Sequence, residues 1–187
     1  MLRIIHAPHP TLTKGVREVK KIDKKIRELV YDMEETLIAQ VDPQGVGLAA
    51  PQVDVDLAIF IIKPTLKSET MVFINPKILE VKSAKPAEPV NPTPADEIDS
   101  AEGEDVKLEG CLSIPKIWGP VERHQKVLVE YQDLNGEKHK EWFGGFKAVI
   151  VQHEADHLNG ILFTERSLEQ KSQLYKENDG ELEKIKY

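Results

Sequence analysis

The stretch 152–157 reads Gln-His-Glu-Ala-Asp-His and combines imidazole and carboxylate groups at spacings that suit metal chemistry. Residues four positions apart lie on the same face of an α-helix, so His153 and His157 can bind a single metal ion. Glu154 lies about 100° further round such a helix, where it borders that ion without having to bind it. The pattern therefore predicts a divalent metal site with a general base beside it.

A packed or solvated pair of histidines is the alternative, because a short motif with three fixed positions arises by chance in many proteins. The flanking residues favour the metal site. Residues 148–151 and Leu158 are apolar, and ionisable groups in such surroundings are costly to bury without a partner. We therefore expect a third ligand from another part of the chain.

Cys111 is the only cysteine, and it lies in the stretch 109–113, which reads Glu-Gly-Cys-Leu-Ser. A lone cysteine cannot form an internal disulfide and is often a small buried hydrophobic residue. With His153 and His157, however, its thiolate makes up three ligands of the types that a catalytic zinc or ferrous site uses, and a fourth position stays open for water. The other histidines have no ligand spacing and are expected at the surface: His6, His9, His124 and His139.

The stretch 45–52 reads Gly-Val-Gly-Leu-Ala-Ala-Pro-Gln, and its glycines allow the backbone to come close to a ligand. It does not fit a phosphate-binding loop, because it lacks both the Gly-Lys-Ser/Thr ending and the GxGxxG spacing. Its composition alone also fits a tight turn. Gln52 has the one side chain in this stretch that both donates and accepts hydrogen bonds.

The composition is that of an ordinary globular protein, with 40% hydrophobic and 30% charged residues. A length of 187 residues predicts a single domain over 1–187. The net charge of −7 argues against a nucleic-acid-binding surface. There is no apolar run of transmembrane length, and residues 1–10 lack the apolar core of a signal peptide. We therefore expect a cytoplasmic protein without membrane contact.

The first half of the chain predicts one helix and a group of strands. Apolar residues recur at spacings of three and four after Asp23, a suitable N-cap, which indicates an amphipathic N-terminal helix. Apolar runs over 57–62, 70–74 and 77–82 predict strands. We expect an antiparallel meander with a turn at Asn75-Pro76, since no crossover helix separates these strands.

The segment 83–105 is rich in proline and carries seven acidic residues against one basic residue. This composition predicts a mobile, solvated insert. Beyond it, the pair Asn135-Gly136 predicts a hairpin between 127–131 and 137–143. The metal-motif helix is expected to stop near Gly160.

A capping-box pattern, Ser167-x-x-Gln170, predicts a C-terminal helix that continues to about Asn178. These elements together indicate an α+β fold. In it, antiparallel β-sheets pack around the central metal-binding helix, with an N-terminal and a C-terminal helix beside them.

Three stretches, 45–52, 109–113 and 152–157, match in order the three motifs of the peptide deformylases. The chain resembles this family from about residue 3 to residue 170, and the main departure is the insert at 83–105. The resemblance implies removal of the formyl group from the N-terminal formyl-methionine of new polypeptides, with release of formate.

The same resemblance implies roles for individual residues. Cys111, His153 and His157 would bind the metal, which lowers the pKa of its water and polarises the formyl oxygen. Glu154 would carry the proton from this water to the leaving amine. The side chain of Gln52 and the backbone N–H of Leu112 would stabilise the oxyanion.

For the substrate, the resemblance implies that the backbones of Val46, Gly47 and Gly110 pair with the peptide as an added strand. Val149 and Ile150 are candidates for the apolar methionine pocket. The partner would be the N-terminus of a nascent polypeptide near the ribosome, and the protein would act as a monomer. Fe(II) is the expected ion, with Zn(II) or another transition metal as the alternative.

Two other functions share parts of this pattern. A zinc endopeptidase also uses His-Glu-x-x-His, but its third ligand is a downstream His or Glu rather than a cysteine. A metal-stabilised binding module would fold with the ion and catalyse nothing. We also expect Asp156 to form a buried ion pair with Arg123, because an acid in an apolar helix needs a partner.

Overall fold

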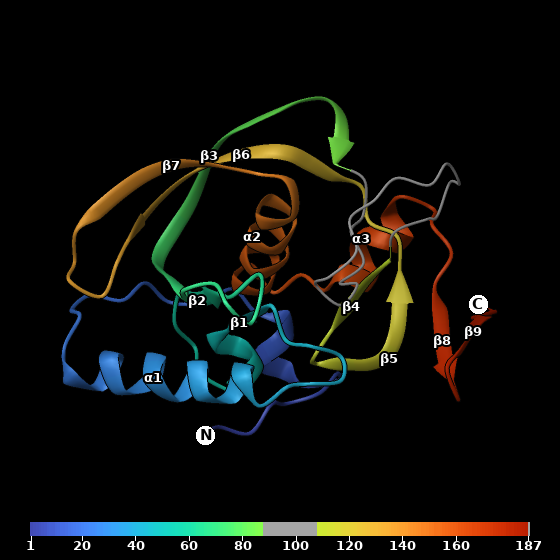
Figure 1. Cartoon of the computed structure of the whole chain (residues 1–187), viewed down its shortest axis with the longest axis horizontal. Coiled ribbons are helices and arrows are strands. Elements are labelled where there is room, and N and C mark those ends of the chain that lie inside the picture. The colour runs from blue at the N-terminus through green and yellow to red at the C-terminus, as the bar shows by residue number, and fades with distance from the viewer. Residues whose placement is uncertain (88–107, 187) are drawn as a thin grey trace.

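The structure is a computed structural model that describes residues 1–87 and 108–186. One antiparallel sheet has the strand order β1-β2-β3-β6-β7 and forms the larger part of the fold (Figure 1). Its strands are β1 (Gly47–Ala49), β2 (Ile59–Ile62), β3 (Met71–Ala87), β6 (Arg123–Gln132) and β7 (Lys138–Gly144). The expected α+β class with antiparallel sheets is confirmed.

The helix α2 (Gly145–Leu158) lies inside the curve of this sheet, beneath the arch of β3, β6 and β7 (Figure 1). Its apolar residues fill a core with the inner face of the sheet, which explains why most of its length is buried. The sheet side of this core includes Phe60, Phe73, Val129 and Phe143, and the helix side includes Ala148, Ile150 and Val151. The helix α2, which carries the His-Glu-x-x-His motif, is therefore the central element of the fold, as the sequence predicts.

The N-terminal helix α1 (Lys24–Ile38) packs on the other side of β1 and β2. Asp23 caps it as expected, because its Oδ1 accepts hydrogen bonds from the backbone N–H groups of Lys25 and Ile26. The second core formed there joins helix residues such as Met33 and Leu37 to strand residues such as Ile59 and Ile61.

The expected turn at Asn75-Pro76 is wrong, because 71–74 and 77–82 belong to the single strand β3. The ladder with β6 shifts between Ile74 and Lys77, and Asn75 has a positive φ of 51°. The side-chain amide of Asn75 bonds the backbone N–H and C=O of Val19. A β-bulge therefore bends the strand where a turn was expected, since the N-terminal segment supplies partners for Asn75.

The expected hairpin about Asn135-Gly136 is confirmed, with Gln132 opposite Lys138 at its end. Of the acidic insert, residues 83–87 belong to β3. The prediction of a mobile loop falls otherwise on residues outside the described part of the chain. Within the described residues, no helix has the length and apolar character needed to cross a membrane.

A second antiparallel sheet, with the order β4-β5-β8-β9, lies beside the helix α3 (Phe163–Glu169). Its strands are β4 (Glu109–Cys111), β5 (Ile114–Gly119), β8 (Tyr175–Asn178) and β9 (Glu181–Lys184). Short 3₁₀ turns, η1 (Pro10–Thr13) and η2 (Ala50–Val53), complete the described elements.

The C-terminal helix predicted from Ser167 to about Asn178 is wrong in its boundaries. The helix α3 begins at Phe163, so Ser167 lies inside it, fully buried, rather than at its N-cap. After α3 the chain forms the β8–β9 hairpin. Leu174 packs with Phe163 and Val121 in a third core, and this tertiary packing overrides the local capping signal.

Candidate metal centre

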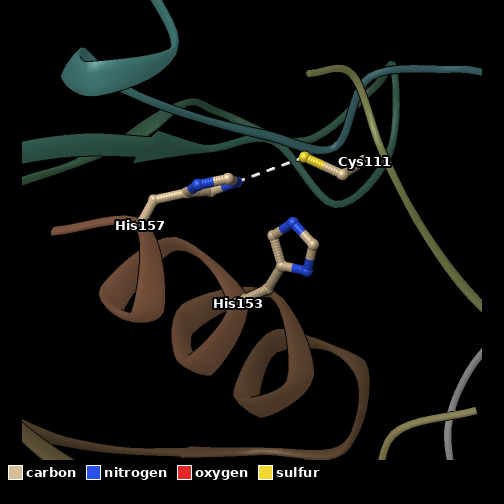
Figure 2. Close-up of side chains that lie close together, drawn as sticks. All are labelled: Cys111, His153 and His157. Atoms are coloured by element: carbon tan, nitrogen blue, oxygen red, sulfur yellow. Dashed lines mark hydrogen bonds between the residues drawn. The ribbon is translucent and has the colours of Figure 1, made fainter. Parts of the chain in front are cut away.

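Three side chains from two elements meet at the centre of the molecule: Cys111 from the end of β4, and His153 and His157 from one face of α2 (Figure 2). Each offers a ligand atom, and these atoms all lie within 4.8 Å of one another. Sγ of Cys111 is 3.2 Å from Nε2 of His157. The helical spacing of four thus brings both imidazoles to the same cysteine.

The surroundings of these groups fit a bound transition-metal ion. Cys111 and His157 are buried, and Nδ1 of His157 has no hydrogen-bond partner among the described residues. Burial lowers the pKa of His157 well below its ordinary value, with the charge of His153 acting in the same direction. A neutral imidazole is the form that binds metal, and a thiolate with two imidazoles is a donor set for zinc or ferrous iron.

The carboxylate of Glu109, which lies in the stretch 109–113, orients His153. No role was predicted for Glu109 from the sequence. Nδ1 of His153 lies 2.9 Å from Oε2 of Glu109, which leaves Nε2 as the ring nitrogen on the side of Cys111. Burial alone lowers the pKa of His153, but hydrogen bonds to Cys111 and Glu109 outweigh it and raise that pKa well above its ordinary value. Carboxylates that fix a ligand imidazole in this way are typical of metal sites.

Glu109 is held in turn by a buried arginine. Nε of Arg123 lies 2.8 Å from Oε1 of Glu109, and Nη2 lies 3.0 Å from Oε2. Burial raises the pKa of Glu109, but Arg123 and His153 more than offset this and hold that pKa at about 2. Glu109 therefore stays ionised and able to accept the hydrogen bond from His153.

The expected pair between Asp156 and Arg123 is present, with Nη1 of Arg123 2.6 Å from Oδ2 of Asp156. The sequence did not reveal a second partner, Arg166 of α3, whose Nη2 lies 2.7 Å from Oδ1 of Asp156. The hydrogen bond to Asp156 raises the pKa of Arg166. This network ties α2 to β4, β6 and α3 around the two histidines.

Glu154 faces the centre from the same helix and is buried. Its Oε2 has no hydrogen-bond partner in the described part of the chain. Burial raises the pKa of Glu154 to about 7. Gly47 of β1 lies against it, because a Cβ at residue 47 would come within 2.9 Å of Cδ of Glu154 and of Cγ2 of Ile150.

Gln52, on η2, directs its amide group toward the cysteine. Oε1 accepts a hydrogen bond from the backbone N–H of Ala49 at 2.8 Å, which fixes the plane of the amide. Nε2 lies 3.5 Å from Sγ of Cys111 and 3.3 Å from Oγ of Ser113. The donor end of Gln52 therefore lies at the metal centre, and Ser113 is a further contact that the sequence motif did not assign.

A cavity opens on this centre and brings the remaining candidate residues together. The residues proposed for substrate binding and for oxyanion stabilisation all line it: Val46, Gly47, Gln52, Gly110, Leu112, Val149 and Ile150. Cys111, His153 and Glu154 line the same cavity, with Phe146 and Trp118. The structure therefore places the candidate reacting groups and the candidate binding surface around one cavity.

A second group of potential ligands, Asp133, Glu137 and His139, lies in the β6–β7 hairpin. The hairpin's own bonds account for its arrangement. Asp133 accepts hydrogen bonds from the backbone N–H groups of Asn135 and Glu137, and its other oxygen lies 3.2 Å from Nε2 of His139. We assign no metal site there.

Comparison with known proteins shows the family that the chain resembles. The family model for polypeptide deformylase matches residues 1–173. A peptide deformylase of Rhodopirellula baltica is 38% identical over 168 residues, which cover 88% of this chain and 72% of that protein. One of Desulfotalea psychrophila is 36% identical over 180 residues, which cover 94% of this chain and 93% of that protein.

Solved structures give the same result. The crystal structure of peptide deformylase from Thermotoga maritima superposes with a TM-score of 0.72 at 34% identity, covering 89% of this chain and 97% of that one. A peptide deformylase from Synechococcus elongatus in complex with actinonin gives 0.72 at 31% identity, covering 95% of this chain and 80% of that one.

Proposed function

Because the chain belongs to the polypeptide deformylase family, we propose that the groups around Cys111 carry out the removal of the formyl group from the N-terminal methionine of new polypeptides. The observation that carries the proposal is the convergence of Cys111, His153 and His157 beside the buried Glu154, whose Oε2 has no hydrogen-bond partner among the described residues. The products are formate and a free amino terminus.

The three converging side chains would hold one divalent metal ion. When bound, the ion supplies a Lewis acid for the formyl oxygen and lowers the pKa of a water molecule in its open position. Fe(II) is the proposed ion, with Zn(II) as the alternative that the same donors accept. Glu109 keeps the ring of His153 in the orientation needed for binding.

Glu154 acts as the general base and then as the general acid. Its carboxylate accepts a proton from the attacking water and returns it to the nitrogen of the leaving amine. Its pKa of about 7 supports this role. A group that first accepts and then donates a proton works best when its pKa lies near the working pH. Burial also protects the transferred proton from bulk solvent.

Gln52 and the backbone N–H of Leu112 donate hydrogen bonds to the oxyanion that forms on the formyl carbon. The amide of Gln52 is already oriented by Ala49 and directed at the centre. Such a preoriented donor needs no rearrangement during the reaction, and one donor contributes about 3–4 kcal/mol to lowering the barrier.

The peptide would add as a strand between the backbones of Val46 and Gly47 on one side and Gly110 on the other. β1 is the edge strand of the larger sheet and β4 is the edge strand of the smaller one, so both have an open edge in the described fold. Val149 and Ile150 would receive the methionine side chain. The flexible thioether of methionine suits an apolar pocket of this kind.

We propose that the protein is a single catalytic domain over 1–187 and that it acts in the cytoplasm as a monomer. It would act on nascent chains near the ribosome without binding nucleic acid directly. The net charge of −7 supports this last point, since nucleic-acid-binding surfaces are basic.

Formate release from formyl-Met-Ala-Ser tests the proposal, with protein purified and assayed without oxygen. We expect one formate for each new amino terminus and no cleavage inside the peptide. Cleavage of internal peptide bonds without formate would identify an endopeptidase. Metal-dependent folding without turnover would identify a binding module.

A further inference from the structure

Trp118 of β5 covers the strand residue that precedes the metal-binding cysteine. In the β4–β5 ladder, Gly110 lies directly opposite Trp118. The six-membered ring of the indole packs so closely there that a Cβ on Gly110 would lie 2.6 Å from Cζ3 and 2.8 Å from Cε3. Glycine at 110 is therefore required by the indole above it.

The indole also lines two hollows of the surface. One is the cavity of the metal centre, which Trp118 lines together with His153 and Glu154. The other is lined by Trp118 with His6 and Lys116. Both include Gly110, Cys111 and Leu112 in their walls. A peptide that extends from the metal centre into the second hollow would therefore have the indole in its wall.

A carboxylate on the C-terminal hairpin holds the other end of this ring. Nε1 of Trp118 donates a hydrogen bond to Oε2 of Glu177 at 2.7 Å. β8 pairs with β5 and places Tyr175 opposite Trp118, so Glu177 is two residues further on the same face of β8. A hydrogen bond to a charged acceptor is stronger than one between neutral groups.

The indole is thus fixed at two points, over Gly110 and at Glu177. The first point belongs to the family motif, whereas the hairpin β8–β9 follows residue 173, where the family match ends. The hairpin β8–β9 therefore reaches the wall of the cavity through the hydrogen bond between Glu177 and Trp118.

We propose that Glu177 is a positioning residue that holds the indole of Trp118 against the peptide substrate, so that the C-terminal hairpin contributes to peptide selectivity. The contact is to substrate residues that follow the formyl-methionine, because the formyl end is taken up at Cys111. This inference rests on the proposed function. A hairpin that only stabilises the fold is the alternative.

The test compares formyl-methioninamide, which has no following residue, with formyl-Met-Ala-Ser. For Glu177→Ala we expect an increase of about three- to tenfold in KM for the tripeptide, the effect of one lost hydrogen bond. We expect unchanged kcat and an unchanged KM for the amide. Glu177→Gln retains an acceptor oxygen and should restore the KM of the tripeptide to within about twofold.

Glu181→Ala is the matched control, because it removes a carboxylate from the same hairpin at an exposed position. It should leave both substrates unaffected. In a Trp142→Phe background, Trp118 is the remaining tryptophan, and Glu177→Ala should shift its fluorescence.

An unchanged KM for the tripeptide in Glu177→Ala overturns the inference and leaves the proposed function intact, since wild-type formate release is measured in the same assay. An equal loss of kcat on both substrates, with a lower melting temperature, shows a purely structural hairpin and also overturns it. A wild-type protein that releases no formate from either substrate overturns the proposed function and the inference together.

Discussion

Oε2 of Glu109 lies 2.9 Å from Nδ1 of His153, and Arg123 binds the same carboxylate. The residue two positions before Cys111 therefore orients a histidine that is far away in the sequence. Both segments of the candidate metal centre are coupled through this contact, because β4 supplies Cys111 and also the carboxylate that orients His153.

Glu109→Ala should lower the affinity for the metal about 10- to 100-fold, the usual cost of losing a carboxylate behind a ligand histidine. Competition with a chelator measures this affinity, and circular dichroism checks that the fold remains. Glu122→Ala, at an exposed position directly before Arg123, is the control. Equal metal affinity in Glu109→Ala and the wild type would contradict the role of this contact.

Gly47→Ala should reduce kcat/KM about 100-fold, because the new methyl group would collide with Glu154 and Ile150 and displace Glu154, the proposed general base. Steady-state formate assays measure the change. Gly15→Ala is a matched control, since a Cβ at Gly15 meets no atom within 4 Å. A Gly47→Ala enzyme as active as Gly15→Ala would show that Glu154 is not placed by this contact.

Glu154→Gln should keep the metal and lose about 10²- to 10⁴-fold in kcat, because the amide cannot accept the proton from water. The measurement pairs formate assays with metal analysis of the same sample. If kcat stays within a few-fold of the wild type while the metal content is unchanged, the general base must be another group.

Arg123→Ala and Arg166→Ala should differ in stability although both remove a partner of Asp156. The side chain of Arg123 is 5% exposed and that of Arg166 is 35% exposed. Loss of Arg123 removes the buried cation that pairs with both Glu109 and Asp156 and should cost about 3–5 kcal/mol in the free energy of unfolding. Loss of Arg166 should cost about 1 kcal/mol, because solvent screens its pair. Urea unfolding compares the two, and equal losses would contradict the difference in burial.

Features set by local sequence could be predicted from the chain alone. The two histidines share a face because of their spacing on the helix, and the N-cap at Asp23 lies beside the groups it binds. The hairpin at Asn135-Gly136 depends on its own turn residues. Each of these depends on residues only a few positions apart.

Features set by contacts between distant segments were missed or misplaced. Asn75 reads as a turn residue, but Val19 from the N-terminal segment satisfies its amide and the strand continues. Ser167 reads as a helix cap, but burial of Phe163 and Leu174 starts the helix earlier and ends it sooner. The ion pair between Arg166 and Asp156 could not be predicted, because no local sequence pattern indicates an ion pair between two helices.

Metal analysis of the wild type and of Cys111→Ala tests the central claim most directly, with both proteins prepared without oxygen and assayed for formate release. The account predicts about one divalent ion per wild-type chain and, in Cys111→Ala, loss of both the ion and formate release in a protein that still folds. A Cys111→Ala protein that keeps its metal and releases formate at the wild-type rate would contradict the account.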